Sequence, residues 1–203
     1  ARKGGGSFRF DVVGKAAHAG IEPLKGANAI VQLAHQSVAL HGLFGMRPGM
    51  SINVGVVSGG TVSNTVPDRA SATIDVRIAD PADTAPVEAA IHAIGAQVHI
   101  AGTSTTVSGG IKTPAMAYTP QVAALAELTK ACASELGFAV NDAHTGGMSY
   151  ANYLAELGLP VLDGLGPVGA YFHNPTLEYV AIDSIVPRTA LLALVMTRVH
   201  TAV

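Results

Sequence analysis

The order of hydrophobic patterns over residues 5–109 constrains the fold of this chain more than any other feature of its sequence. Residues 7–13 alternate apolar and polar side chains, which places Phe8, Phe10 and Val12 on one face of a half-buried strand. The same kind of pattern predicts further strands over residues 51–57, 70–78 and 97–108 and helices over residues 28–43 and 86–95. This β-α-β-β-α-β order is typical of a split unit in which two helices cover one face of a four-stranded sheet.

The chain beyond Gly109 and Gly110 has a different character, and the glycine pair predicts a domain boundary near residue 110. Helical periodicity predicts helices over residues 121–136, 149–157 and 183–200, the last with Ser184 as cap and Pro187 in its first turn. Short strands are predicted only over residues 138–140 and 160–162. Two strands are too few for a sheet, so residues 111–203 are expected to be part of a larger α/β domain. The predicted fold class is α/β, of the α+β kind.

Composition excludes several classes of protein and partner. Half of the residues are hydrophobic (49%) and only 13% are charged, which argues against a disordered chain. A net charge of -2 and scattered Lys and Arg residues leave no electrostatic surface for nucleic acid. No stretch approaches the roughly 18 apolar residues of a membrane span, so no membrane partner is expected. The single Cys132 excludes a disulfide framework and leaves cytoplasmic and periplasmic locations open.

Two loops of the first domain contain candidate functional residues. His18 lies among small residues in GKAAHAG, where an imidazole stays accessible to a ligand, although a single loop histidine is more often an ordinary surface residue. Asn64 lies in the turn-rich segment GGTVSNTVPDRA and can offer an amide to a carboxylate or an oxyanion. Asparagine is also a common turn residue, and spacing alone favours that interpretation.

Two segments of the second half are also candidates. Gly146 and Gly147 precede a predicted helix in HTGGMSYAN, where backbone N–H groups can approach an anion, and a tight turn explains the pair equally well. His173 lies in GPVGAYFHNPTLEYV, and histidine is a common zinc ligand. A zinc site needs three or four ligands, whereas these residues offer one candidate. Cys132 lies mid-helix between alanines, which predicts a packed side chain.

Taken in order, these segments resemble the zinc-dependent metallopeptidases that include aminoacylase, succinyl-diaminopimelate desuccinylase and glutamate carboxypeptidase, with the last branch the most similar. The matching stretches are GKAAHAGIEPLKGANAI, SINVGVVSGGTVSNTVPDRASATIDVRI and TGGMSYANYLAELGLPVLDGLGPVGAYFHNPTLEYVAIDSIVPR. The resemblance implies a catalytic α/β domain with two zinc ions and an inserted β-α-β-β-α-β lid domain that pairs in a homodimer. Residues 5–110 match the lid, and residues 111–203 match the C-terminal part of the catalytic domain.

The resemblance also implies an activity and roles for individual residues. The activity is hydrolysis of an amide next to a free carboxylate in a peptide or N-acyl amino acid, with release of C-terminal glutamate as one candidate reaction. His173 matches a metal ligand, and His18 matches a lid histidine that reaches the partner's active site and stabilises the oxyanion. Contacts with substrate are assigned to Asn64, Arg77, Lys112, Gly146 and Gly147.

Two departures from the family pattern limit these expectations. The His-x-Asp pair, the bridging Asp and the Glu-Glu pair of the family's N-terminal half are not in these residues, so the chain as written cannot hold two zinc ions. Tyr150 stands where an Asp is usual. The chain begins at Ala1 with neither Met nor a signal peptide, so we expect it to start within a longer enzyme. The alternative is a complete, non-catalytic dimerisation or binding module.

Overall fold

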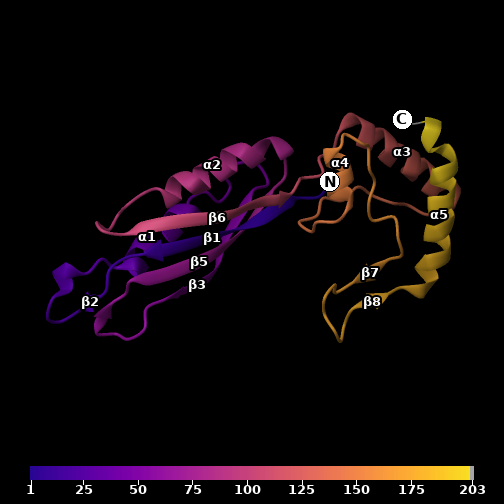
Figure 1. Cartoon of the computed structure of the whole chain (residues 1–203). Helices are drawn as coiled ribbons and strands as arrows, with labels where there is room; N and C mark the ends of the chain where they lie inside the picture. The colour runs from indigo at the N-terminus through magenta and orange to yellow at the C-terminus, as the bar shows by residue number, and fades with distance from the viewer. Residues whose placement is uncertain (202–203) are drawn as a thin grey trace. The chain divides into compact units, whose positions relative to one another are not determined.

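The computed structural model describes residues 1–201, which divide into two compact units (Figure 1). Arg2–Ala117 and Thr145–Asn152 form one, which we call the sheet unit. Tyr118–His144, residues 153–201 and Ala1 form the other, which we call the helical unit. No helix within residues 1–201 has both the length and the apolar content needed to cross a membrane.

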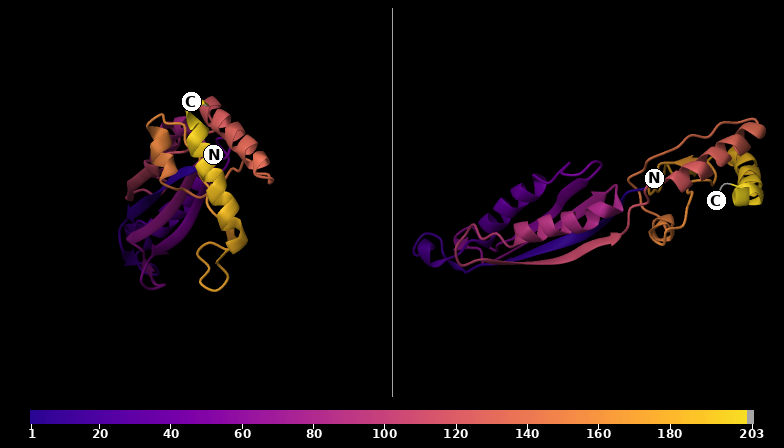
Figure 2. Two further views of the ribbon diagram at one scale, coloured as in Figure 1. Left: turned by 90° about the vertical axis from the view of Figure 1, so that its right-hand side faces the viewer. Right: turned by 90° about the horizontal axis from the view of Figure 1, so that it is seen from above.

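The sheet unit is built on four antiparallel strands in the spatial order β3-β5-β1-β6. Their bounds are Gly4–Val13 for β1, Ser51–Gly59 for β3, Arg69–Ile78 for β5 and Ser104–Thr113 for β6. Helices α1 (Ala29–His41) and α2 (Thr84–Gly95) connect the strands and lie on the same side of the sheet, as the right-hand view of Figure 2 shows. The predicted β-α-β-β-α-β fold is confirmed.

The core lies between the two helices and the sheet face that they cover. Inward residues of β1 and β5 meet inward residues of the helices, and the largest fully buried side chains include Phe8, Phe10, Ile74, Ile78, Leu33, Leu40 and Ile91. The predicted alternation of residues 7–13 is therefore confirmed: Arg9 and Asp11 point to the open face, where Arg9 Nη2 lies 2.9 Å from Asp11 Oδ1.

Two buried glutamines of α1 connect this helix to the segment after α2. The Gln36 side chain is fully buried, and its Nε2 donates to the carbonyl oxygen of Gly95 at 3.1 Å and to Thr105 Oγ1 at 3.0 Å. Gln32 Oε1 accepts the backbone N–H of His99 at 2.8 Å. Buried polar groups cannot bond to water, so a shift of α1 would leave these amides unpaired. The hydrogen bonds therefore fix the position of the helix.

The bounds predicted for the last strand were wrong. Residues 97–103 form a loop, because Gln32 takes the N–H of His99 that a neighbouring strand would otherwise bind, and Gly102 turns the chain with a φ of 84°. Strand β6 then continues through Gly109 and Gly110 to Thr113. A Cβ at Gly109 would lie 2.1 Å from the carbonyl oxygen of Ser7, so the close approach of β1 requires the glycine.

The helical unit is held by α3 (Pro120–Glu135) and α5 (Ile185–Arg198), which bury Cys132, Ala133 and Leu191 between them. It also contains most of α4 (Ala151–Glu156) and a hairpin of β7 (Gly169–Ala170) and β8 (Tyr179–Val180). The strands predicted over residues 138–140 and 160–162 are absent from the described chain. No neighbouring strand within residues 1–201 pairs with either segment, and pairing is what makes an extended segment a strand.

A bidentate ion pair joins the ends of α3 and α5. Arg198 Nη1 and Nη2 lie 2.6 and 3.0 Å from the two carboxylate oxygens of Glu135. This hydrogen bonding lowers the pKa of the Glu135 carboxyl below its ordinary value. The carboxylate therefore adds to the stability of the helical unit when it is charged.

Replacing Gln36 with Ala is expected to lower the free energy of unfolding of the sheet unit by about 2 kcal/mol, because the carbonyl oxygen of Gly95 and the hydroxyl of Thr105 lose a buried partner. Urea denaturation measures the change. Gln121→Ala, the same substitution at an exposed site of α3, is the control and should have a much smaller effect. Equal effects of the two variants would contradict a stabilising role for the buried amide.

Acid should weaken the helical unit through Glu135. Its pKa is lowered on folding, so its contribution is complete above the unfolded pKa, near 4.5, and is lost as the pH falls through the folded value. Glu135→Gln should therefore be less stable than the parent at pH 6 and equally stable well below pH 4, as followed by thermal unfolding. The control Glu156→Gln, on the exposed end of α4, should keep the parent's pH dependence. A Glu135→Gln variant with the parent's stability at pH 6 would refute this role.

Candidate functional site

His18 and Asn64 come together at one end of the sheet unit. There β2 (Ala17–His18) pairs with β4 (Thr65–Val66) in a short ribbon that we call the tip. His18 lies opposite Thr65, and the N–H of Ala19 donates to the backbone carbonyl oxygen of Asn64 at 2.9 Å. Both residues are exposed. The backbone of Asn64 forms part of the turn, while its exposed side chain stays available for a ligand. The turn interpretation and the functional interpretation of Asn64 are therefore compatible.

The imidazole of His18 is oriented by the turn that follows it. Its Nδ1 accepts the backbone N–H groups of Gly20 and Ile21, each at 3.1 Å. Because Nδ1 acts as an acceptor, the neutral ring carries its proton on Nε2. The tip therefore presents an exposed N–H donor held by backbone hydrogen bonds, which is the group that stabilisation of an oxyanion requires.

Arg77 and Lys112 lie at the opposite end of the sheet, beside the start of β1. Arg77 pairs in register with Gly5, and its guanidinium is held by Asp75, with Nε to Oδ2 at 2.9 Å and Nη2 to Oδ1 at 2.8 Å. A Cβ at Gly5 would lie 2.4 Å from the carbonyl oxygen of Val76 and 2.8 Å from Arg77 Cδ, so the close approach of β5 requires the glycine. Lys112 is exposed where the register between β1 and β6 shifts.

The length of β1 separates these two groups of residues. At about 3.4 Å per residue, the segment from Gly5 to Val13 spans about 27 Å, and His18 lies beyond Val13 (Figure 1). A substrate of the size of an N-acyl amino acid cannot touch Arg77 and His18 of the same chain.

Gly146 and Gly147 belong to the sheet unit, although they follow the first helix of the helical unit in sequence. Arg2, which precedes β1, donates from Nη1 to the carbonyl oxygen of Gly147 at 3.1 Å. The backbone N–H of Lys3 donates to the carbonyl oxygen of Thr145 at 3.0 Å. The glycine pair thus lies at the same end of the sheet as Arg77.

Asn152 was not among the predicted site residues, and it is fully buried beside these glycines. Its Nδ2 donates to the carbonyl oxygens of Lys3 and Pro114, and its Oδ1 accepts the N–H of Ser149 at 2.9 Å. A signal was present, because Ser149 and Asn152 have the three-residue spacing of a capping box at the start of α4.

His173 lies in the loop between β7 and β8, where the backbone is strained. Tyr171 and His173 have φ values of 59° and 67°, which side-chain-bearing residues rarely adopt. Asn174 supports the turn, because its Oδ1 accepts the N–H groups of Thr176 and Leu177 at 3.1 and 3.0 Å. Such strain costs on the order of 1–3 kcal/mol per residue and occurs often at functional sites.

The residues present do not form a metal centre by themselves. Within residues 1–201, no group of three or more His, Cys, Asp or Glu side chains can hold a metal ion. His173 is exposed and can contribute one ligand. A dinuclear centre of the kind that the sequence predicts would need ligands from other residues.

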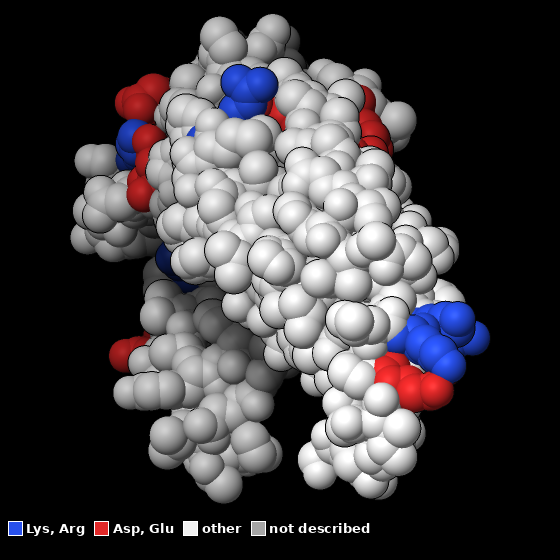
Figure 3. Space-filling view, turned by 90° about the vertical axis from the view of Figure 1, so that its left-hand side faces the viewer, with Lys and Arg blue, Asp and Glu red and all other residues white. Residues whose placement is uncertain are grey.

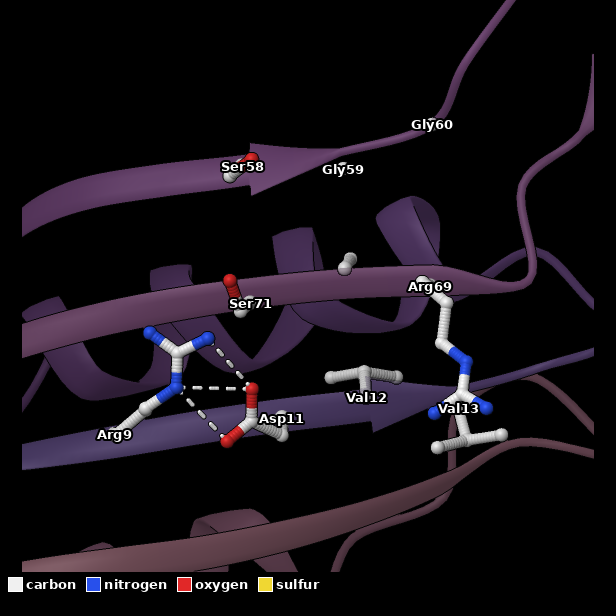
Figure 4. Close-up of a pocket in the computed structure, with 10 residues that line it drawn as sticks. Arg9, Asp11, Val12, Val13, Ser58, Gly59, Gly60, Arg69 and Ser71 are labelled. Carbon is white, nitrogen blue, oxygen red and sulfur yellow. Dashed lines mark hydrogen bonds and ion pairs between the residues drawn. The ribbon is translucent and has the colours of Figure 1, made fainter.

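The open face of the sheet has a polar hollow with a volume of about 300 Å³, shown in Figure 4. Arg9, Asp11, Ser58, Arg69 and Ser71 are among its lining residues. Arg9 is hydrogen-bonded to Asp11, whereas Arg69 extends over the end of β1 beside Val13. None of the residues predicted from the sequence lines this hollow.

Comparisons with known sequences identify the family of the chain. Residues 1–103 match the peptidase dimerisation domain of the M20 family. The chain is 28% identical to carboxypeptidase G2 of Pseudomonas sp. strain RS-16 over 186 residues, which cover 91% of this chain and 45% of that protein. It is 43% identical to a p-aminobenzoyl-glutamate hydrolase homolog of Haemophilus influenzae over 65 residues, which cover 32% of this chain and 15% of that protein. The chain therefore spans less than half the length of these relatives.

Solved structures share the fold. Aminopeptidase PepT from Bacillus cereus superposes with a TM-score of 0.82 at 22% identity, over 98% of this chain and 52% of that one. A dinuclear metal-binding peptidase of the M20 family from Bacillus subtilis superposes with a TM-score of 0.71 at 15% identity, over all of this chain (100%) and 52% of that one. The predicted fold class and the family resemblance are both confirmed. The chain belongs to the M20 peptidase family and carries the dimerisation domain of that family.

Proposed function

We propose that this chain is the lid and the C-terminal part of a zinc-dependent hydrolase that cleaves an amide bond next to a free carboxylate. The observation that carries the proposal is His18, an exposed N–H donor oriented by two backbone hydrogen bonds at the tip. Family membership and the names of the relatives, a carboxypeptidase and an aminobenzoyl-glutamate hydrolase, support the same class of reaction.

The positions of the polar and charged residues support different roles for the two ends of the sheet. Arg77 and Lys112 lie at the same end of the sheet as the glycine loop, and we assign them to the substrate carboxylate. His18 at the tip is assigned to the developing oxyanion, with Asn64 next to it as a second polar contact for the substrate. Because β1 keeps these groups more than about 27 Å apart, each active site takes its tip residues from the partner chain.

The metal ions would be held mainly by residues outside this chain, with His173 as one ligand. When bound, zinc supplies an activated water and polarises the carbonyl of the scissile amide. The loop between β7 and β8 orients His173 through the Asn174 turn, and Ser184 Oγ, which accepts the N–H of Val168 at 2.9 Å, holds the start of this hairpin. Peptides and N-acyl amino acids, including N-acyl glutamates, are the proposed substrates.

A second copy of the chain is the proposed partner at the edge formed by β3 and α1. Strand β3 is an edge strand, and its Val56 and Val57 are 62% and 59% exposed. Val38 of α1 is 75% exposed. Between Lys25 and Asp68, Arg47 is the only Asp, Glu, Lys or Arg in the sequence. Figure 3 looks onto the left-hand side of Figure 1, where the Lys, Arg, Asp and Glu side chains lie mainly around the rim of the visible surface. An uncharged edge with exposed valines favours strand-to-strand pairing.

One observation favours a second candidate function, a non-catalytic dimerisation or binding module. Within residues 1–201, the side chains do not assemble a metal site. The upstream coding sequence separates the two candidates. A His-x-Asp pair and a Glu-Glu pair upstream of Ala1 support the enzyme, and a start codon directly before Ala1 supports the module.

Two histidine variants of the full-length protein test the enzyme. His18→Ala is expected to lower kcat by roughly 100-fold or more with little loss of zinc, because it removes a donor to the oxyanion. His173→Ala is expected to lose zinc. Metal analysis and hydrolysis of p-aminobenzoyl-glutamate measure both effects. Unchanged turnover in His18→Ala would exclude its role at the partner's active site.

A charged substitution at the β3 edge tests the dimer. Val57→Lys is expected to raise the dissociation constant of the homodimer by about tenfold or more, because pairing would bury an unpaired ammonium group. Sedimentation equilibrium measures the change. Val98→Lys is the matched control, since Val98 is 61% exposed but lies in the loop before β6. A parent chain that stays monomeric, or equal dissociation of both variants, would rule out pairing through β3.

A further inference from the structure

Hydrogen bonds tie the glycine loop of residues 145–149 to the start of β1. The N–H of Lys3 donates to the carbonyl oxygen of Thr145 at 3.0 Å, and Arg2 donates to that of Gly147 at 3.1 Å. Arg2 also forms antiparallel bridge pairing with Met116, just after β6. The loop therefore extends the end of the sheet, although the helical unit contains the residues on both sides of it in sequence.

Asn152 joins all three of these segments with one side chain. Its Nδ2 donates to the carbonyl oxygen of Lys3 at 3.1 Å and to that of Pro114 at 2.8 Å, which uses both amide hydrogens. Its Oδ1 accepts the N–H of Ser149 at 2.9 Å. The side-chain amide of asparagine offers two N–H donors and one oxygen acceptor. Here both the NH2 group and the oxygen are hydrogen-bonded, and the residue is fully buried.

Gly146 lies in the anchored loop with open space around it. A Cβ placed there would meet no atom within 4 Å, and its φ does not lie in the left-handed region. Within the described residues, therefore, neither packing nor backbone conformation requires a glycine at position 146. A glycine at such a position allows a ligand to approach the backbone closely.

We propose that Asn152 is a positioning residue for substrate binding. By fixing the glycine loop to the end of the sheet, it keeps the backbone of Gly146 and Gly147 at a constant place relative to Arg77 and Lys112. The carboxylate-bearing part of the substrate then meets the loop and the two cations as one preformed surface. This inference rests on the proposed function and adds a residue that does not itself touch the substrate.

Hydrogen exchange followed by mass spectrometry tests the anchoring on the full chain. Asn152→Ala is expected to speed exchange of the amides of residues 145–149 by roughly tenfold, because it removes the bond to the Ser149 N–H and the two bonds that connect Asn152 to Lys3 and Pro114. Exchange in β1 and β5 should stay as in the parent, which separates local loosening from unfolding. Asn141→Ala, an exposed asparagine nearby in sequence, is the matched control. Arg2→Ala is a milder second variant, which should loosen residues 145–149 in the same direction.

Kinetics of the full-length protein with p-aminobenzoyl-glutamate test the positioning. Asn152→Ala should raise KM by about tenfold or more with a smaller change in kcat and unchanged zinc content, since a displaced loop weakens binding. Exchange of residues 145–149 as slow as in the parent would overturn the anchoring. Faster exchange with an unchanged KM would overturn the role in substrate binding. A parent enzyme that is inactive would overturn the proposed hydrolysis and with it the substrate role, whereas the exchange result still decides the anchoring.

Discussion

The pairing of β1 with both β5 and β6 is the interaction on which the rest of the sheet unit depends. β1 is a central strand, and its ten residues pair with β5 without a break in register. A one-residue slip would turn Phe8 and Phe10 from the core to the open face and expose their hydrophobic surface to water. The register therefore determines both which side chains form the core and which residues stand at each end of the sheet.

The two ends of this sheet have different chemistry. One end combines Arg77, Lys112 and the glycine loop, and the other carries the oriented donor of His18. A strand of this length holds them too far apart for one small substrate, so the proposed site takes its tip residues from a second chain. In the proposed homodimer, the dimerisation domain would complete each active site and so take a direct part in the proposed reaction.

Periodicity in the sequence predicted the strands and helices of the sheet unit well, because each pattern depends on residues close together in the chain. Two kinds of prediction failed. The last strand began later than expected, because the side chain of Gln32 captures the N–H of a residue in the loop before it. The two strands predicted beyond residue 137 did not form, because a strand requires a partner, and residues 1–201 supply none for them.

The order of elements, the apolar faces and the motifs that identify the family could be predicted from the sequence, since these are properties of neighbouring residues. Which of the candidate residues lie close together became clear only from the folded chain. It placed His18 beside Asn64, gave the imidazole its Nε2 proton through two backbone donors, and assigned the glycine loop to the sheet unit through Asn152. Each of these results depends on the three-dimensional geometry of hydrogen bonds. Many of these bonds join residues far apart in the chain, and local sequence patterns do not predict them.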